Sequence, residues 1–161
     1  TATIVWTERK GGNLTNAPAG KQPVFLVYAL RDPDGPNLDR IQVIKGWLDN
    51  AGKSQERIFD VAVSGERKIG QDGRCKESVG NTVDVPNATY SNSIGAPVLS
   101  AYWKDPAFDA KQRAFYYVRA IQIPSPRWTA YDQKRYGIKM DAKVPMIVTD
   151  RAYTSPVWYT P

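Results

Sequence analysis

The chain contains no histidine and only one cysteine, Cys75, among its 161 residues. Histidine is the commonest general base at neutral pH and the commonest transition-metal ligand, so no Ser-His or Cys-His catalytic pair can form within this chain. A single cysteine also excludes an internal disulfide and a cysteine-rich zinc site. We interpret Cys75, in the polar segment GQDGRCKESVG, as an incidental thiol, with a bridge to a cysteine outside the chain as the alternative. Any chemistry here would need Asp, Glu, Lys, Tyr or Arg.

Long apolar runs are missing as well. No stretch approaches the ~20 consecutive apolar residues that a membrane-spanning helix needs, so we expect no membrane span. No charged-then-apolar leader precedes Thr1, and the sequence does not start with methionine. We therefore expect either a processed mature chain or a piece of a longer protein.

The residues that are present suffice for one hydrophobic core. They are 42% hydrophobic and include five Trp, nine Tyr and four Phe, while the length is too short to expect two domains. A single β-rich domain over residues 1–161 is the prediction. The net charge of +6 is spread along the chain, so it permits attraction to anions without demonstrating it.

Runs of β-branched and aromatic residues, bounded by Gly, Pro, Asn or Asp, recur along almost the whole chain, which is the pattern of strands and turns. Seven or eight such strands with one short helix favour the mainly β class and an antiparallel β-sandwich-like domain. The strands are predicted at residues 2–7, 23–30, 40–49, 56–64, 96–103, 113–123, 144–149 and 155–160.

The segments between these strands predict two hairpins, one long loop and one helix. The sequence DNAG at 49–52 is typical of a hairpin turn, and Asp-Pro at 105–106 opens a second one. Residues 65–95 have little periodicity, and a loop of this length is usually functional or held by its surroundings. The helix is predicted within WTAYDQKRYG, with Thr129 as N-cap and Gly137 as terminator.

An acidic cluster offers weak candidates for a metal site. The segment RDPDGPNLDR contains Asp32, Asp34 and Asp39, and Ca²⁺ binds several oxygen ligands of this kind. The spacing does not match the helix-loop-helix calcium pattern, and Asp-Pro and Asp-Gly are also ordinary turn sequences. A structural loop is the favoured interpretation, and we expect no cofactor in this chain.

Two cations lie among apolar residues on their predicted strands. Strand alternation places Arg119 on one face with four large apolar side chains, and it places Lys45 among apolar neighbours in the same way. Such a cation must extend to solvent, pair with a carboxylate or face a cleft. Extension of the charged group to solvent or structural pairing, with Asp60 as a candidate partner, is favoured over contact with an anion or substrate.

The run from Arg113 to Gly137 combines aromatic and basic side chains, which raises the question of a ligand surface. Single-stranded nucleic acid would need exposed aromatics. Residues 115–117 are three consecutive aromatics that must fall on both faces of a strand, as in the middle of a buried sheet, so we expect no nucleic-acid partner. A sugar-binding module would use a flat aromatic platform, with core packing as the simpler role of each candidate. The platform candidates are Trp103, Trp128, Trp158 and Tyr159.

Several long phrases of the sequence are distinctive when they are taken together. They are YALRDPDGPNLDRIQVIKGWLD, IFDVAVSG, VGNTVD, ATYSNSIGAPVLSAYWKDPAFDAKQRAFYYVRAIQIPSPRWTAYD and the ending RAYTSPVWYTP. In this order, and over nearly all of the chain from Val24 to Pro161, they resemble the C-terminal part of the bacterial domain-of-unknown-function 3604 family.

The resemblance implies a larger exported protein. Members of that family are several times longer, and their N-terminal region resembles metal-dependent hydrolases of the polymerase-and-histidinol-phosphatase (PHP) type, in which clustered His, Asp and Glu bind a metal that activates water. The resemblance supplies no functional residues for this chain. It implies a C-terminal fragment with a periplasmic or secreted location.

We therefore expect a non-catalytic β-sandwich portion that scaffolds or shapes the active site of a missing N-terminal domain, which is its partner. The intact protein is then a candidate metal-dependent hydrolase of an unknown small-molecule substrate, with a divalent metal in that N-terminal domain. The alternative is an independent module that binds carbohydrate or an anion. A scaffold is expected to expose a broad apolar patch, and a binding module an aromatic groove. The residues proposed for the module are Arg119, Lys45, Trp103 and Trp128.

Overall fold

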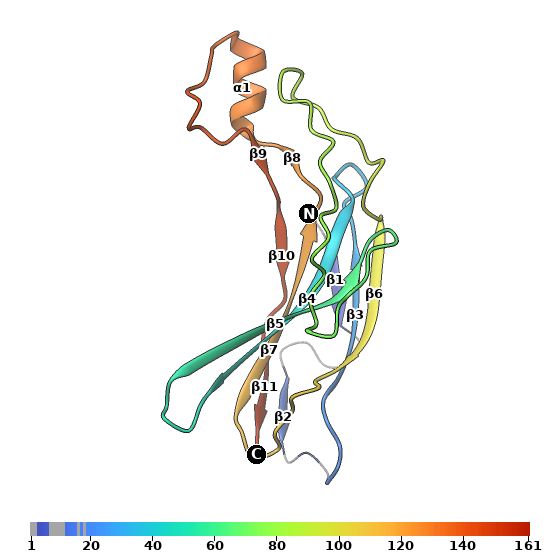
Figure 1. Cartoon of the computed structure of the whole chain (residues 1–161), viewed down its shortest axis with the longest axis vertical. Coiled ribbons are helices and arrows are strands. Elements are labelled where there is room, and N and C mark those ends of the chain that lie inside the picture. Colours follow the sequence, from blue (N-terminus) through green and yellow to red (C-terminus); the bar gives the residue numbers. More distant parts are fainter. Residues whose placement is uncertain (1–2, 7–11, 16, 18) are drawn as a thin grey trace.

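The computed structural model describes residues 3–6, 12–15, 17 and 19–161, which form two β-sheets and a projecting helical arm (Figure 1). One sheet contains β1 (Thr3–Trp6), β3 (Val24–Leu30) and β6 (Val98–Lys104), in that order. The other contains β2 (Asn13–Thr15), β11 (Val157–Thr160), β7 (Ala114–Gln122), β4 (Leu38–Leu48) and β5 (Ser54–Val63), and β10 (Arg151–Tyr153) also pairs with β7. A short ladder joins β8 (Ser125–Pro126) to β9 (Ile147–Val148), and the helix is α1 (Trp128–Tyr136).

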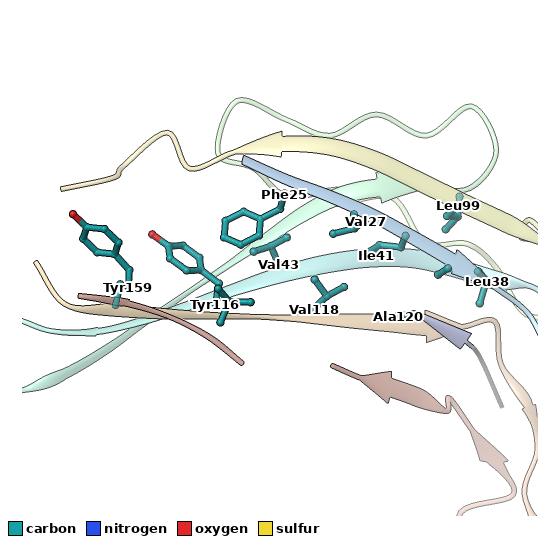
Figure 2. Packing of buried hydrophobic residues seen from close by; sticks show 13 residues of the cluster. Phe25, Val27, Leu38, Ile41, Val43, Leu99, Tyr116, Val118, Ala120 and Tyr159 are labelled. Carbon is teal, nitrogen blue, oxygen red and sulfur yellow. The ribbon is translucent and has the colours of Figure 1, made fainter. Parts of the chain in front are cut away.

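The hydrophobic core lies between the two sheets (Figure 2). β3 alternates buried and exposed residues, so that Phe25 and Val27 face the second sheet. From that sheet, Val43 of β4 and Tyr116 and Val118 of β7 face back toward them. Strand pairing within each sheet is antiparallel apart from the parallel pair of β11 with β2. The predicted mainly β, sandwich-like fold is confirmed.

One of the two predicted hairpins is correct. The turn at 49–52 joins β4 to β5, where Asp49 Oδ1 accepts hydrogen bonds from the backbone N–H groups of Ala51 and Lys53, and Gly52 has a φ of 74°, a value that glycine adopts without steric strain. The second hairpin is wrong. β6 pairs with β3 and β7 pairs with β4, so the segment containing Asp105 crosses from one sheet to the other instead of reversing within a sheet.

The remaining strand predictions agree with the structure in position more than in length. The first predicted strand, residues 2–7, contains β1, while its two end residues lie outside the described residues. The run at 144–149 contains only the two-residue β9. The sequence pattern did not predict β2, β8 or β10, which have two or three residues each and are too short to show an alternation.

The long loop predicted at residues 65–95 is present and has no strand longer than the isolated bridge between Asp84 and Thr89. Its first part is fixed to the second sheet by two ion pairs, Arg67 with Asp39 and Arg74 with Asp60, and by a hydrogen bond from the Cys75 N–H to Asp60. Its last part returns through Gly95, where a side chain would come within 2.7 Å of Asn37 and Ile123. The loop is therefore held by its surroundings.

The helix α1 ends as predicted and begins differently. Gly137 adopts the left-handed conformation with a φ of 62° and terminates it. Thr129 is not the N-cap: the cap is Arg127, without a side-chain cap hydrogen bond, and the Thr129 hydroxyl donates to Pro145 O instead. Figure 1 shows α1 beyond the ends of the sheets, beside the tip of the long loop, where Lys134 Nζ donates to Asn87 O (2.8 Å). We call residues 127–147 the arm.

Candidate functional site

The outward face of the six-stranded sheet carries a line of four aromatic side chains, which we call the aromatic strip. In β7 every second residue is buried, and the residues between them, Phe115 and Tyr117, lie half-buried on the opposite face. Trp158 of β11 pairs in register with Phe115, and Tyr153 of β10 extends the line at the other end. Trp158 is 51% exposed and Tyr153 is 55% exposed. The strip thus consists of Trp158, Phe115, Tyr117 and Tyr153.

The rings of the aromatic strip follow one another at short, regular intervals. The ring centroids are 5.2 Å apart from Trp158 to Phe115, 6.4 Å from Phe115 to Tyr117 and 6.3 Å from Tyr117 to Tyr153. The two central rings are nearly parallel, with an interplanar angle of 11°, and the end rings are tilted by 47° and 39° relative to their neighbours. The four rings therefore form a continuous row, in which the planes of the two central rings are nearly parallel and the end rings are tilted.

Gly46 makes room for the central ring. It pairs with Phe115 in register, and a Cβ at this position would lie only 2.3 Å from the far end of the Phe115 ring. The ring thus covers the glycine, and a groove of about 530 Å³ opens beside it between β4, β5, β7 and β11. Its lining includes Gly46, Glu56, Arg113, Phe115 and Trp158.

Charged groups of both signs border this groove. Glu56 and Arg113 are exposed, and within the described part of the chain neither side chain makes a hydrogen bond or an ion pair. Burial, followed by the negative charge of Glu56, raises the pKa of Tyr117 above its ordinary value. The Tyr117 hydroxyl therefore stays protonated at neutral pH and can donate or accept a hydrogen bond.

Arg119 continues the face of β7 beyond the strip and joins a polar network. Its Nε and Nη2 atoms both donate to Gln42 Oε1, at 2.8 and 2.5 Å, and Gln42 Nε2 donates to Asp60 Oδ1 at 2.6 Å. Arg119 thus has a structural partner, but this partner is the Gln42 amide, which lies between Arg119 and the Asp60 carboxylate. Among the described residues, the Nη1 atom of Arg119 has no hydrogen-bond partner.

Asp60 is the centre of this network, and its side chain is completely buried. Its Oδ2 atom accepts hydrogen bonds from Arg40 Nη1 (3.2 Å) and from the Cys75 N–H (2.7 Å), and it lies 3.4 Å from Arg74 Nε. These donors satisfy the hydrogen-bonding capacity of the buried carboxylate oxygen. Its role here is to attach the long loop to the sheet, and Cys75 itself is buried at that attachment.

Lys45 lies inside the sandwich, where it is 3% exposed. Its Nζ atom donates to Asp105 Oδ2 (2.6 Å) and to Ala107 O (2.7 Å), and the Tyr116 hydroxyl donates to the same Asp105 oxygen (2.8 Å). Structural pairing is therefore correct for Lys45, with Asp105 as its partner in place of Asp60. A molecule bound at the surface has no access to this ammonium group.

The two tryptophans proposed from the sequence lie in different environments. Trp103 is partly buried in the core, with ring centroids 5.0 Å from Phe59 and 5.8 Å from Phe25. Trp128 is 61% exposed at the start of α1, below the guanidinium group of Arg127. The structure does not bring Arg119, Lys45, Trp103 and Trp128 together into one site. Tyr159 is buried in the core, and Trp158 belongs to the aromatic strip.

The acidic cluster at residues 31–40 does not form a common site. Asp39 pairs with Arg40 and Arg67 (3.0 and 2.6 Å). Arg31 Nη1 donates hydrogen bonds to the backbone carbonyl oxygens of Asp32, Pro33 and Gly35. Within the described ranges, no three His, Cys, Asp or Glu residues lie close enough together to hold a metal ion.

Sequence reasoning missed Phe115, Tyr117, Tyr153 and Glu56 as members of one surface. Alternation correctly placed Phe115, Tyr117 and Arg119 on one face, but it does not tell which face of β7 points to solvent. Both faces carry aromatic side chains, and the core face also includes the small residues Ala114 and Ala120. The remaining signal was Gly46 in the middle of a strand, because a strand glycine marks the close approach of another group.

Comparisons with known proteins give one match. The comparisons with curated proteins and with solved structures found no match. No helix in the described part of the chain is long and apolar enough to cross a membrane. The family model that matches covers residues 7–161 and is described as a protein of unknown function, DUF3604. The chain therefore belongs to the DUF3604 family of proteins of unknown function.

Proposed function

We propose that this chain is the non-catalytic β-sandwich portion of a larger exported bacterial protein, in which it packs against and shapes the active site of an N-terminal domain. The resemblance of longer family members to PHP-type metal-dependent hydrolases supports that choice of partner. The structural observation that carries the proposal is the arm, which projects from the sandwich with most of its large apolar side chains in solvent.

The helix of the arm is too short and too exposed to be stabilised by this chain alone. α1 has nine residues, of which only Thr129 and Ala130 are buried. Isolated helices of this length are marginal in water, because most helical stability in proteins comes from packing one face. A second surface is therefore needed to cover the exposed apolar residues of the arm. These are Trp128, Tyr131, Tyr136, Ile138 and Ile147.

The charge of the arm indicates the character of the covering surface. Between residues 127 and 143 the arm has five basic residues and two acidic ones. Lys134 and Arg135 lie in the last turn of α1, where they also complement the helix dipole. An apolar surface bordered by carboxylates fits this arm best, and a domain whose metal site gathers acidic residues provides such a border.

Hydrogen exchange tests the proposed docking. We expect the backbone amides of α1 to exchange at least about tenfold more slowly in the full-length gene product than in the 161-residue chain, because docking stabilises the helix against local opening. Mass spectrometry of peptides covering residues 127–140 measures this difference. Equal exchange in the two proteins, or a reading frame that encodes no further domain, would refute the scaffold role.

Enzymatic assays of the full-length protein test whether the partner is a hydrolase. We expect metal-dependent cleavage of an aryl phosphate ester, and we expect Trp128→Ala combined with Tyr131→Ala to lower it at least about fivefold by displacing the sandwich. Tyr102→Ala, which removes a similarly exposed ring on β6, is the matched control and should retain activity. Inactivity with every divalent metal and ester tested would contradict the hydrolase assignment.

A further inference from the structure

We propose that the aromatic strip, with the groove beside Gly46, binds an extended neutral polysaccharide chain. The site lies on the six-stranded sheet, and Figure 1 shows β11, which carries one end of it, at the opposite end of the molecule from the arm. It is therefore distinct from the docking surface proposed above. The two proposals rest on different residues, so an experiment that refutes one of them leaves the other unaffected.

The strip matches the repeat of a sugar chain. Pyranose rings carry apolar C–H groups on their flat faces, and aromatic rings bury these faces with little loss of side-chain entropy. The intervals of 5.2 to 6.4 Å between successive ring centroids are close to the length of one sugar unit. The four rings thus provide a track along which successive units of one linear chain can lie.

The sheet already supports the inner sides of the central rings, which leaves their outer sides for a ligand. Phe115 rests over Gly46, and Tyr117 pairs in register with Ile44, which is completely buried. The strip therefore does not need a protein partner to fix its central rings in place. A ligand would bind to side chains that are already held in place, so binding would cost little side-chain conformational entropy.

The polar groups beside the rings suit hydroxyl groups. Glu56 can accept hydrogen bonds and Arg113 can donate them. Arg119 Nη1, which has no partner among the described residues, can also donate. A sugar hydroxyl can do both, so it can satisfy either kind of group. Glu56 and Arg113 are the two charged residues that line the groove, and their opposite charges balance. A neutral chain therefore fits better than one that carries many charges of one sign.

A proline-rich peptide is the other extended ligand that docks on aromatic grooves. Its prolines lack N–H groups and offer only carbonyl acceptors to the protein. Such a peptide has no backbone donor for the Glu56 carboxylate, whereas a sugar hydroxyl can donate to it. The chemistry of the groove therefore favours the carbohydrate.

Calorimetric titration of the purified protein with cellohexaose, xylohexaose and chitohexaose tests the proposal. We expect at least one of these neutral hexasaccharides to bind with a Kd below about 1 mM, within the range of weak specific ligands. Trp158→Ala and Tyr153→Ala should each raise that Kd about tenfold, because each removes one exposed stacking ring. The control Tyr102→Ala removes an even more exposed ring on the other sheet and should leave the Kd unchanged.

Three results would overturn the proposal. The first is the absence of binding by all three sugars at about 10 mM. The second is an equal loss of affinity in Tyr102→Ala and Trp158→Ala. The third is a decaproline peptide that binds at the strip when the sugars do not. Thermal unfolding of each variant establishes that it is folded, and Glu56→Gln, which keeps the shape of the side chain, provides a further variant that should weaken binding severalfold.

Discussion

Lys45, Asp105 and Tyr116 hold a charge inside the sandwich, at the point where the chain crosses from one sheet to the other. The Asp105 side chain is completely buried, and one of its oxygens accepts from both Lys45 and Tyr116, while the other accepts from the Ala107 N–H. Removing one member of a buried pair leaves the other charge unpaired, which is strongly destabilising. These contacts fix the crossing segment relative to β4 and β7.

Tyr116 gives this cluster a predictable dependence on pH. Its pKa lies well above the ordinary value of 10, first because of burial and then because of its hydrogen bond to Asp105. Below about pH 10 the tyrosine is protonated in both the folded and the unfolded states. As the pH rises further, only the unfolded state loses this proton, so the free energy of unfolding should fall.

Tyr116→Phe tests this assignment. We expect the variant to have a free energy of unfolding about 1–2 kcal/mol lower at pH 8, because Asp105 loses a buried hydrogen bond. We also expect a shallower decline above pH 10 than in the wild type, because the titrating hydroxyl is gone. Urea denaturation from pH 8 to pH 11 measures both effects, and equal slopes above pH 10 would argue against the role of Tyr116.

Among the structural elements, the long loop depends on Asp60 for its attachment, and Cys75 offers a chemical probe of that attachment. Asp60→Asn keeps the size of the side chain and removes its charge, which weakens the contacts with Arg40 and Arg74. We expect Cys75 to react at least about tenfold faster with a thiol reagent in this variant, because the loop opens more often. Asp72→Asn, which removes an exposed ion pair with Lys76, should react at the wild-type rate.

Within β4, Gly46 should tolerate a methyl group only if Phe115 is also reduced. Gly46→Ala is expected to lower the free energy of unfolding by about 1–3 kcal/mol, because the new Cβ would collide with the Phe115 ring. In Gly46→Ala combined with Phe115→Ala the collision is absent, so the two changes should be strongly non-additive. Thermal unfolding of the double-mutant cycle measures this coupling, and additive effects would show that the ring moves aside freely.

For the whole molecule, alternation of apolar and polar residues predicted the sandwich-like fold and most strand positions. The reason is that one face of each strand packs against the core while the other faces solvent. Alternation did not predict the partners of β6 and β7, since Asp105-Pro106 suits a crossing between sheets as well as a tight turn. It also did not predict the aromatic strip, because the three strands that carry it, β7, β10 and β11, meet only through long-range pairing. The sequence pattern within one strand does not show which distant strand pairs with it or which residues lie opposite one another.

The position of β11 has a practical consequence for protein production. Thr160 lines the groove and Pro161 follows it directly, so a purification tag fused after Pro161 would begin beside the proposed ligand site. A short flexible linker would hold the tag there at an effective concentration in the millimolar range. The tag could cover the groove, so the titrations should use protein from which it has been removed.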